Sequence, residues 1–295
     1  PQEAERVLKS GQADMIGMTR AQIADPEMAN KAREGRLDDI RACIACNQAC
    51  IGHMQMGIGI SCIQRPETGR ELDYEQKPKT TSPRTVLVAG GGPAGMKAAA
   101  VAAERGHKVI LCEASPRLGG QALLAQELPG RAEFGGIVTN LAHEMQVHGV
   151  EVRMETQVTL ELIKSIEAGA VILATGATPH KPALEGQEDA HVVDAWQVIR
   201  GEANVGGRVV IADWRCDWVG LGLAEKLARD GCKVTLAVNG YTPGQMIQMY
   251  VRDRWIGDLH KLGVEIIPYA RLFGADATSA YLQHVTSGEA IIVDD

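Results

Sequence analysis

The sequence has few aromatic residues, no long apolar run and no surplus of positive charge. Only two of its 295 residues are Phe, so the core must be built from Ala, Val, Ile, Leu and Met. No apolar stretch approaches the roughly 20 residues that a membrane-spanning helix needs, so we expect no membrane association. The net charge of −7, without a basic run interleaved with aromatics, argues against nucleic acid as a partner.

The sequence also lacks the signs of an oxidising compartment. It has seven cysteines, an odd number, and no signal-peptide pattern, so we expect a cytoplasmic protein without disulfides. Glycine, by contrast, is abundant, and the 33 glycines cluster where strands turn into helices. Such turns are typical of nucleotide-binding α/β proteins. The length predicts about two domains.

Four of the cysteines lie in one stretch, CIACNQACIGHMQMGIGISC. Cys43, Cys46, Cys50 and Cys62 are separated by two, three and eleven residues. Four thiolates in such a stretch can hold an iron–sulfur cluster or a structural zinc. Zinc sites usually come as two short pairs, whereas three crowded cysteines and a fourth beyond a loop favour a 4Fe–4S cluster. We predict that cluster, shielded from water by the apolar residues that precede the fourth cysteine.

The first forty residues predict a helix, a short strand over 13–18, a loop and a second helix that begins at Asp25-Pro26. This order is one unit of a (β/α) barrel, and one unit cannot close a barrel alone. We therefore expect residues 1–40 to be the terminal βα unit of a TIM barrel, in a piece of a longer polypeptide. Loops after the last barrel strands often bind phosphate, and Arg20 would supply a forked cation there. The alternative is a surface arginine beside a turn.

A dinucleotide-binding pattern follows a polar connector over 67–84. The strand TVLVA leads into GGGPAG and an Ala-rich helix, and the next strand ends in Glu113. Gly90 permits the tight turn, Gly92 lets the backbone approach a pyrophosphate, and Gly95 lets helix and strand pack closely. The helix N-terminus favours an anion, and Glu113 can accept hydrogen bonds from a ribose. The alternative is a glycine-rich turn that binds no nucleotide.

A second pattern of the same kind covers residues 207–238, but its glycine fingerprint is incomplete. Where GxGxxG is expected, the sequence offers Arg215, Asp217 and Gly220. The Cβ atoms of the first two would obstruct the backbone, and an Asp carboxylate repels a pyrophosphate. We therefore predict that the fold is kept and that the NAD(P) site is lost. A shifted alignment that hides a usable turn is the alternative.

The segments DMIGMTRAQIADP, RACIACNQAC and GGGPAG, in this order and with the lone Cys62, resemble the iron–sulfur flavoprotein branch of the old yellow enzyme superfamily. The resemblance implies an FMN-binding TIM barrel, of which the sequence holds the last unit, and a 4Fe–4S segment over 41–66. It also implies an FAD (or ADP)-binding Rossmann domain over 85–184. A second Rossmann-like domain with a degenerate NAD(P) fingerprint would cover 185–295. The expected fold class is thus α/β.

The same resemblance assigns site residues. It implies that Arg20 contacts the FMN phosphate and that the four cysteines ligate the cluster. Leu118 to Gln121 resembles a turn that lies along the nucleotide, and AVILATG resembles the strand and turn that return to the flavin domain. No catalytic residue is assigned, because the barrel's own would lie upstream. The predicted cofactor-binding residues are Arg20, Gly90, Gly92, Ala94, Gly95, Glu113, Gly120, Gln121, Thr175 and Gly176.

Two parts of the sequence disagree about function. The cysteine spacing resembles dienoyl-CoA reductases, whereas the broken second turn resembles amine dehydrogenases and demethylases. We give more weight to the second turn than to the cysteine spacing, because that turn would contact the electron donor itself. We expect an oxidoreductase, possessing FMN, 4Fe–4S and FAD, that oxidises a small methylated or primary amine. It would pass electrons to a soluble acceptor protein and could form homo-oligomers.

Two alternatives stay open. One is an NAD(P)H-dependent 2,4-dienoyl-CoA or enone reductase, with electrons flowing the other way. The other belongs to a different class: a stand-alone nucleotide-binding electron-transfer module, or a structural fragment that binds zinc.

Overall fold

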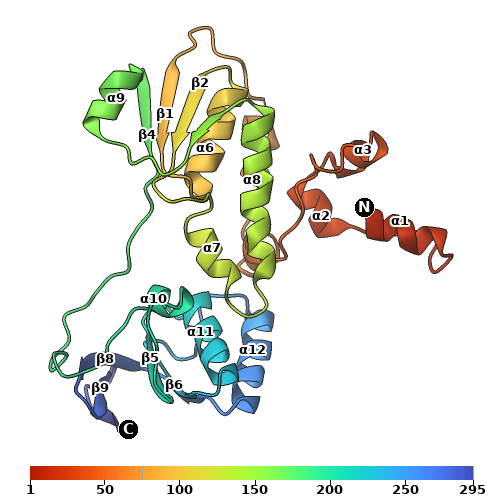
Figure 1. Cartoon of the computed structure of the whole chain (residues 1–295). Helices are drawn as coiled ribbons and strands as arrows, with labels where there is room; N and C mark the ends of the chain where they lie inside the picture. Colours follow the sequence, from red (N-terminus) through yellow and green to blue (C-terminus); the bar gives the residue numbers. More distant parts are fainter. Residues whose placement is uncertain (75, 295) are drawn as a thin grey trace. The chain divides into compact units, whose positions relative to one another are not determined.

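The computed structural model describes residues 1–74 and 76–294, which form two compact units (Figure 1). The first unit comprises residues 1–123 and 133–176, and the second comprises 124–132 and the residues from 177 onward. The helices and strands of the first unit are α1 (Gln2–Lys9), α2 (Thr19–Ala24), α3 (Met28–Arg33), η1 (Gln48–Gly52), α4 (His53–Gln55), α5 (Glu71–Tyr74), β1 (Thr85–Ala89), α6 (Pro93–Glu104), β2 (Lys108–Cys112), α8 (Gly135–Val147), β3 (Glu151–Arg153), α9 (Leu160–Ile166) and β4 (Ala170–Leu173).

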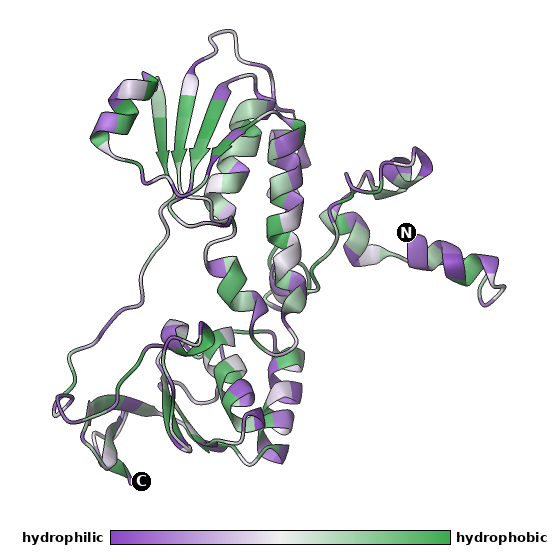
Figure 2. Cartoon of the chain, in the orientation of Figure 1, coloured by the Kyte–Doolittle hydropathy of each residue, from purple (hydrophilic) through white to green (hydrophobic). Residues whose placement is uncertain are grey.

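The first unit is built on a parallel sheet with the strand order β3-β2-β1-β4. Helices α6 and α8 cover one face and α9 covers the other (Figure 1). The central strands are hydrophobic almost throughout because both of their faces are covered (Figure 2). Val88 and Leu111 pack under α6 and α8, whereas Leu87 and Ile110 pack under α9. This order is that of a dinucleotide-binding half, as predicted.

The strand expected over 13–18 is wrong: the structure has no strand there. A strand must pair its backbone with a neighbour, and no described segment pairs with these residues. Met15 is accordingly 84% exposed. The helix expected to begin at Asp25-Pro26 is present but begins later, at Met28, with Glu27 in the N-cap position, so the predicted start is wrong. The Asp25 carboxylate instead accepts a hydrogen bond from the Glu27 amide and forms an ion pair with Lys31.

The segment after the fourth cysteine is more ordered than a connector. Gln64, Arg65, Glu67 and Thr68 are all buried. Thr68 donates to the Ile23 carbonyl, and Glu67 pairs with Lys77 at 2.8 Å. The cysteine segment is therefore tied to the residues on both sides of it.

The second unit also begins with a parallel sheet, in the order β5-β6-β7, and continues with an antiparallel sheet, β8-β9-β10. Its elements are α10 (Ala195–Ile199), β5 (Arg208–Asp213), α11 (Trp218–Arg229), β6 (Lys233–Val238), α12 (Met249–Lys261), β7 (Glu265–Ile267), β8 (Ala270–Ala275), β9 (Ser279–His284) and β10 (Ala290–Asp294). Two short helices, α7 (Gln121–Gln126) and η2 (Ala132–Phe134), lie where the chain passes between the units.

The core of the second unit lies between β5, β6, α11 and α12. Trp255 is buried there, and its indole N–H donates to Glu225 at 2.7 Å. The second nucleotide-type fold is thus present as predicted. Of the helices in the described ranges, none is long and apolar enough to span a membrane.

Candidate nucleotide and cluster sites

The glycine turn between β1 and α6 is closed by contacts that only glycine permits. An ideal Cβ at Gly90, where φ is +110°, would lie 2.3 Å from the Ala174 carbonyl oxygen. An ideal Cβ at Gly95 would lie 1.9 Å from the Gly90 carbonyl oxygen. At Gly92, in contrast, nothing lies within 4 Å of the ideal Cβ, so the fold itself leaves room there. Gly90 and Gly95 thus serve the fold, whereas Gly92 borders open space at the helix N-terminus.

Glu113, at the end of β2, completes the turn. One carboxylate oxygen accepts from the Gly91 amide at 2.6 Å, and the other accepts from the Ser115 amide at 2.8 Å. Burial opposes ionisation, but these amide hydrogen bonds hold the pKa of Glu113 below its usual value. Glu113 is therefore anionic at neutral pH and fixed beside the turn.

The other predicted nucleotide residues meet the turn from two directions. An ideal Cβ at Gly120 would lie 3.1 Å from Gly92 Cα, and one at Gly176 would lie 3.5 Å from the Gln121 amide nitrogen. Ala174 follows β4 and hydrogen-bonds to Ala89, which brings the neighbouring Thr175 to the same edge. Because β1 and β4 are adjacent parallel strands, their carboxyl ends meet at this edge, which is the usual ligand position in such folds. Ala94 lies exposed in the first turn of α6.

The four predicted cluster ligands also come together. Cys43, Cys46, Cys50 and Cys62 line one small cavity in the first unit. Within residues 1–74 and 76–294, no three His, Cys, Asp or Glu side chains converge as they would on a single ion. The cavity is thus lined by four thiols, the donor set of a thiolate-ligated centre, and the preference for an iron–sulfur cluster over zinc stays a prediction from the cysteine spacing.

The backbone of the cysteine turn is strained in the way that functional sites often are. Ala45 and Asn47, on either side of Cys46, both have left-handed conformations with φ of +52° and +57°. The Ala45 amide donates to the Cys43 sulfur at 3.4 Å. Burial raises the pKa of the Cys46 thiol, and the three other cysteines act in the same direction. A bound cation would reverse this effect, because metal ions hold cysteine as thiolate.

The expectation that apolar residues shield this cavity is wrong for the described part of the chain. Met54, Met56, Ile58 and Ile60 are all exposed, Met56 by 66%. Met54 lies in α4 and the other three follow it, and the amides of Met56 and Ile58 donate back to the carbonyl of His53.

Polar residues missed in the sequence hold the cysteine segment on the nucleotide fold. The buried Gln64 donates to the Ala42 carbonyl at 2.8 Å and accepts from Asn140 of α8 at 2.9 Å. Glu144, one turn further along α8, pairs with Arg41 and with Lys97 of α6. Burial opposes ionisation of Glu144, but these two cations lower its pKa. Helix α8 therefore links the cysteine segment to the helix that starts at the glycine turn.

Arg20 lies at the start of α2 and lines the cysteine cavity. Its guanidinium donates to the Asn47 side chain at 2.6 Å. The structure thus places Arg20 beside the cysteine turn, while its predicted contact with FMN phosphate stays a prediction.

In the second unit, two carboxylates occupy the turn where a dinucleotide would bind. Asp213, the last residue of β5, accepts from the Arg215 and Cys216 amides at 3.1 and 2.8 Å. Asp217 caps α11 by accepting from the Val219 amide and pairs with Arg215 at 2.9 Å. An ideal Cβ at Gly220 would lie 2.2 Å from Asp213 Oδ2. The surviving glycine of the fingerprint therefore makes room for Asp213.

Asp213 was not recognised from the sequence, although an acid at the end of an apolar strand is a visible signal. Its Oδ2 is buried without a hydrogen-bond partner in the described residues. Burial raises the pKa of Asp213 to about 6, and the nearby Asp217 adds to the shift. The turn thus carries its own negative charge where a pyrophosphate would need amide donors.

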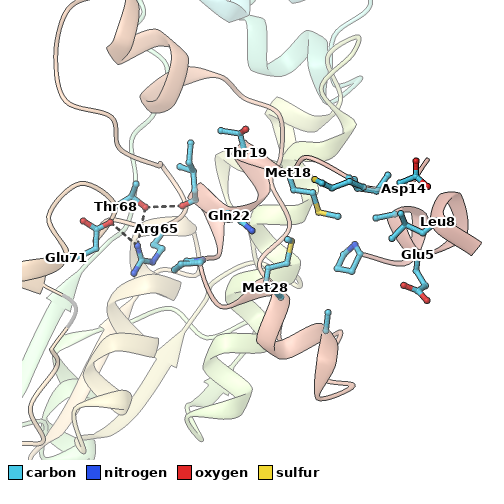
Figure 3. A pocket seen from close by; sticks show the side chains of 18 residues that line it. Glu5, Leu8, Asp14, Met18, Thr19, Gln22, Met28, Arg65, Thr68 and Glu71 are labelled. Atoms are coloured by element: carbon cyan, nitrogen blue, oxygen red, sulfur yellow. Dashed lines mark hydrogen bonds and ion pairs between the residues drawn. The ribbon is translucent and has the colours of Figure 1, made fainter. Parts of the chain in front are cut away.

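A larger hollow of about 1040 Å³ lies in the first unit between α1, α2, α3 and the segment around Arg65 (Figure 3). Arg65 hydrogen-bonds there with Thr68 and Glu71, and Met18 and Met28 supply apolar wall (Figure 3). None of the four cysteines and no residue of the glycine turn lines it. The hollow is therefore separate from the cofactor residues predicted here.

Comparison with known proteins matches residues 84–294 to the family described as pyridine nucleotide-disulphide oxidoreductase. A metal reductase of Desulforamulus reducens is 40% identical over 235 residues, which cover 78% of this chain and 35% of that protein. An N,N-dimethylglycine/sarcosine dehydrogenase of Chromohalobacter salexigens is 37% identical over 256 residues, covering 84% and 37%. The structure of histamine dehydrogenase from Rhizobium sp. 4-9 matches with a TM-score of 0.89 and 28% identity, covering 100% of this chain and 45% of that one.

The chain therefore spans less than half the length of these relatives. The recognition of the iron–sulfur flavoprotein branch and of the nucleotide-binding α/β fold is confirmed, and the chain is an oxidoreductase domain with a flavin- or nucleotide-binding fold.

Proposed function

The chain belongs to the pyridine nucleotide-disulphide oxidoreductase family. On this premise we propose that it is part of an enzyme that oxidises a methylated or primary amine. The observation that carries the proposal is the turn after β5, where Asp213 and Asp217 take the amide donors that a nicotinamide dinucleotide would need. Electrons would then leave to a soluble acceptor protein and not to NAD(P). The dehydrogenases of sarcosine and histamine among the similar proteins support an amine as substrate.

We assign the proposed cofactor-binding residues to two sites, the glycine turn between β1 and α6 and the cavity lined by the four cysteines. The amides at the N-terminus of α6 would donate hydrogen bonds to the phosphates of FAD or ADP, and Gly92 leaves room for these phosphates. Glu113 would orient the ribose, with Gly120, Gln121, Thr175 and Gly176 beside the nucleotide. Cys43, Cys46, Cys50 and Cys62 would hold a 4Fe–4S cluster, which when bound supplies one-electron transfer. Arg20 would contact the FMN phosphate.

A reductase that takes hydride from NAD(P)H is the second candidate, and the similarity to a metal reductase favours it. The two functions differ in whether the second unit binds a nicotinamide nucleotide. Calorimetric titration of this chain with ADP and with NADPH addresses that point directly. We expect one ADP equivalent at the glycine turn of the first unit and no additional site for NADPH.

The complete natural protein supplies the second test. Anaerobic mixing with an N-methyl amine should bleach its flavin absorbance, whereas NADPH should leave it unchanged within the same time. If NADPH bleached the flavin rapidly and N-methyl amines did not, the protein would be assigned as the reductase.

A further inference from the structure

Arg20 and Asn47 form a contact that neither the sequence pattern nor the comparisons assign. Arg20 Nη1 donates to Asn47 Oδ1 at 2.6 Å across 27 residues of chain. This distance is short for a hydrogen bond, as expected when the donor carries a charge. Asn47 lies between two of the predicted cluster ligands, Cys46 and Cys50. The contact therefore joins α2 directly to the cysteine turn.

The conformation of Asn47 explains why a partner from outside the turn matters. Its φ of +57° is left-handed, and its carbonyl accepts from the Gly52 amide at 2.9 Å, which starts η1. A left-handed backbone conformation is unfavourable for a residue other than glycine unless its surroundings fix it. The Arg20 guanidinium supplies such a fixed neighbour, and so helps to set the direction in which Cys46 and Cys50 enter the cavity.

The charge of Arg20 is distinctive at this site. Among the described residues that line the cavity together with the four cysteines, Arg20 is the single cation. Four thiolates bring four negative charges, and a guanidinium at the wall offsets part of them. A nearby positive charge favours the more negative redox state of a bound group and so raises its reduction potential.

We propose that Arg20, held at the cavity wall by its hydrogen bond to Asn47, raises through its charge the reduction potential of an iron–sulfur cluster bound by the four cysteines. This rests on the cluster assignment in the proposed function and goes beyond it, because no contact with FMN is needed. The five N–H donors of arginine leave others available for a phosphate. Since Arg20 is exposed, its charge is screened by salt, and the effect should shrink as ionic strength rises.

The test compares Arg20→Gln and Arg20→Lys with a matched control, Arg33→Gln. Arg33 is also an exposed arginine that donates to an asparagine, Asn30, at 3.1 Å, but it does not line the cavity. Each full chain is reconstituted anaerobically with iron and sulfide. The midpoint potential is then measured by redox titration with visible and electron paramagnetic resonance detection. Far-ultraviolet circular dichroism verifies that each variant is folded.

We expect Arg20→Gln to lower the reduced-to-oxidised ratio at the wild-type midpoint about threefold, which is about 28 mV for one electron. Arg20→Lys keeps the charge and should recover most of the shift, and Arg33→Gln should match the wild type. A loaded Arg20→Gln chain with an unchanged midpoint overturns this proposal and leaves the cluster assignment standing. A wild-type chain that takes up neither iron nor sulfide overturns both.

Discussion

The Asp213 carboxylate lies against Gly220, so close that a methyl group on Gly220 would come within 2.2 Å of Oδ2. Gly220 is in the first turn of α11, and Asp213 ends the strand before it. In a dinucleotide-binding turn this glycine serves close packing of helix and strand. Here the space that it leaves is filled by an acidic side chain of the protein itself.

The first prediction concerns this contact. Gly220→Ala should destabilise the second unit by roughly 1–3 kcal/mol, the usual cost of forcing an extra methyl group into a packed site. The better helix propensity of alanine, worth about 1 kcal/mol, offsets only part of that cost. Urea unfolding followed by Trp fluorescence measures the difference.

Gly257→Ala is the matched control. Gly257 lies in the interior of α12 with nothing within 4 Å of its ideal Cβ, so this substitution should stabilise the protein. Equal unfolding free energies for Gly220→Ala and the wild type would show that the helix can move away from Asp213, and the contact would then carry no constraint.

The second prediction concerns pH. The folded-state pKa of Asp213 is raised to about 6 by burial, above the value near 3.9 of an unfolded aspartate. Between these values the folded state binds more protons than the unfolded state, so stability falls as pH rises from about 4 to about 6. A shift of about two pKa units corresponds to about 3 kcal/mol.

Asp213→Asn should remove this part of the pH dependence because asparagine does not titrate, and its oxygen can still accept from the Arg215 and Cys216 amides. The measurement is the unfolding free energy from pH 4 to pH 8 in both proteins. Asp217 and Arg215 face the same turn, so Asp217→Asn is the control that separates their contributions. Parallel curves for the wild type and Asp213→Asn would mean that Asp213 titrates normally.

Much of the fold could be predicted because its signals are local. The apolar run TVLVA and the glycine turn after it specify a buried parallel strand and a helix start with no help from distant residues. The cysteine spacing likewise brings its own ligands together. The strand expected over 13–18 was wrong because a strand depends on a partner, and the pattern of a single segment does not contain that partner.

The candidate site was predicted less completely because its supports are distant in the sequence. Gln64 and Asn140 are 76 residues apart, and Arg41 and Glu144 are 103 residues apart. No spacing rule links such pairs. The apolar residues around Met56 were misjudged for a related reason, since hydrophobicity indicates a preference for burial but not whether other residues cover the side chain.

The third prediction concerns the cysteines. Replacing Cys43, Cys46, Cys50 or Cys62 by Ser should each abolish uptake of iron and sulfide on anaerobic reconstitution, because a cluster that loses one of four thiolates is exposed to water and oxidant. Chemical iron and sulfide analysis, with the visible spectrum, measures the loading. Cys232→Ser is the control, since Cys232 directly precedes β6 in the other unit and its replacement should leave the loading unchanged. Stoichiometric zinc with no visible absorbance would show that the four cysteines bind a structural zinc ion and not an iron–sulfur cluster.

The last prediction separates a glycine that the fold needs from one that a ligand needs. Gly95→Ala would place a methyl group 1.9 Å from the Gly90 carbonyl oxygen, so it should disrupt the turn and lower the unfolding free energy by several kcal/mol. Gly92→Ala meets no atom within 4 Å and has an ordinary φ of −74°, so the protein should fold with stability near the wild-type value. Yet the new methyl group would stand where a pyrophosphate approaches the backbone, and titration with FAD or ADP should show at least a tenfold loss of affinity. A Gly92→Ala chain that binds both nucleotides as tightly as the wild type would place the phosphates elsewhere on the first unit.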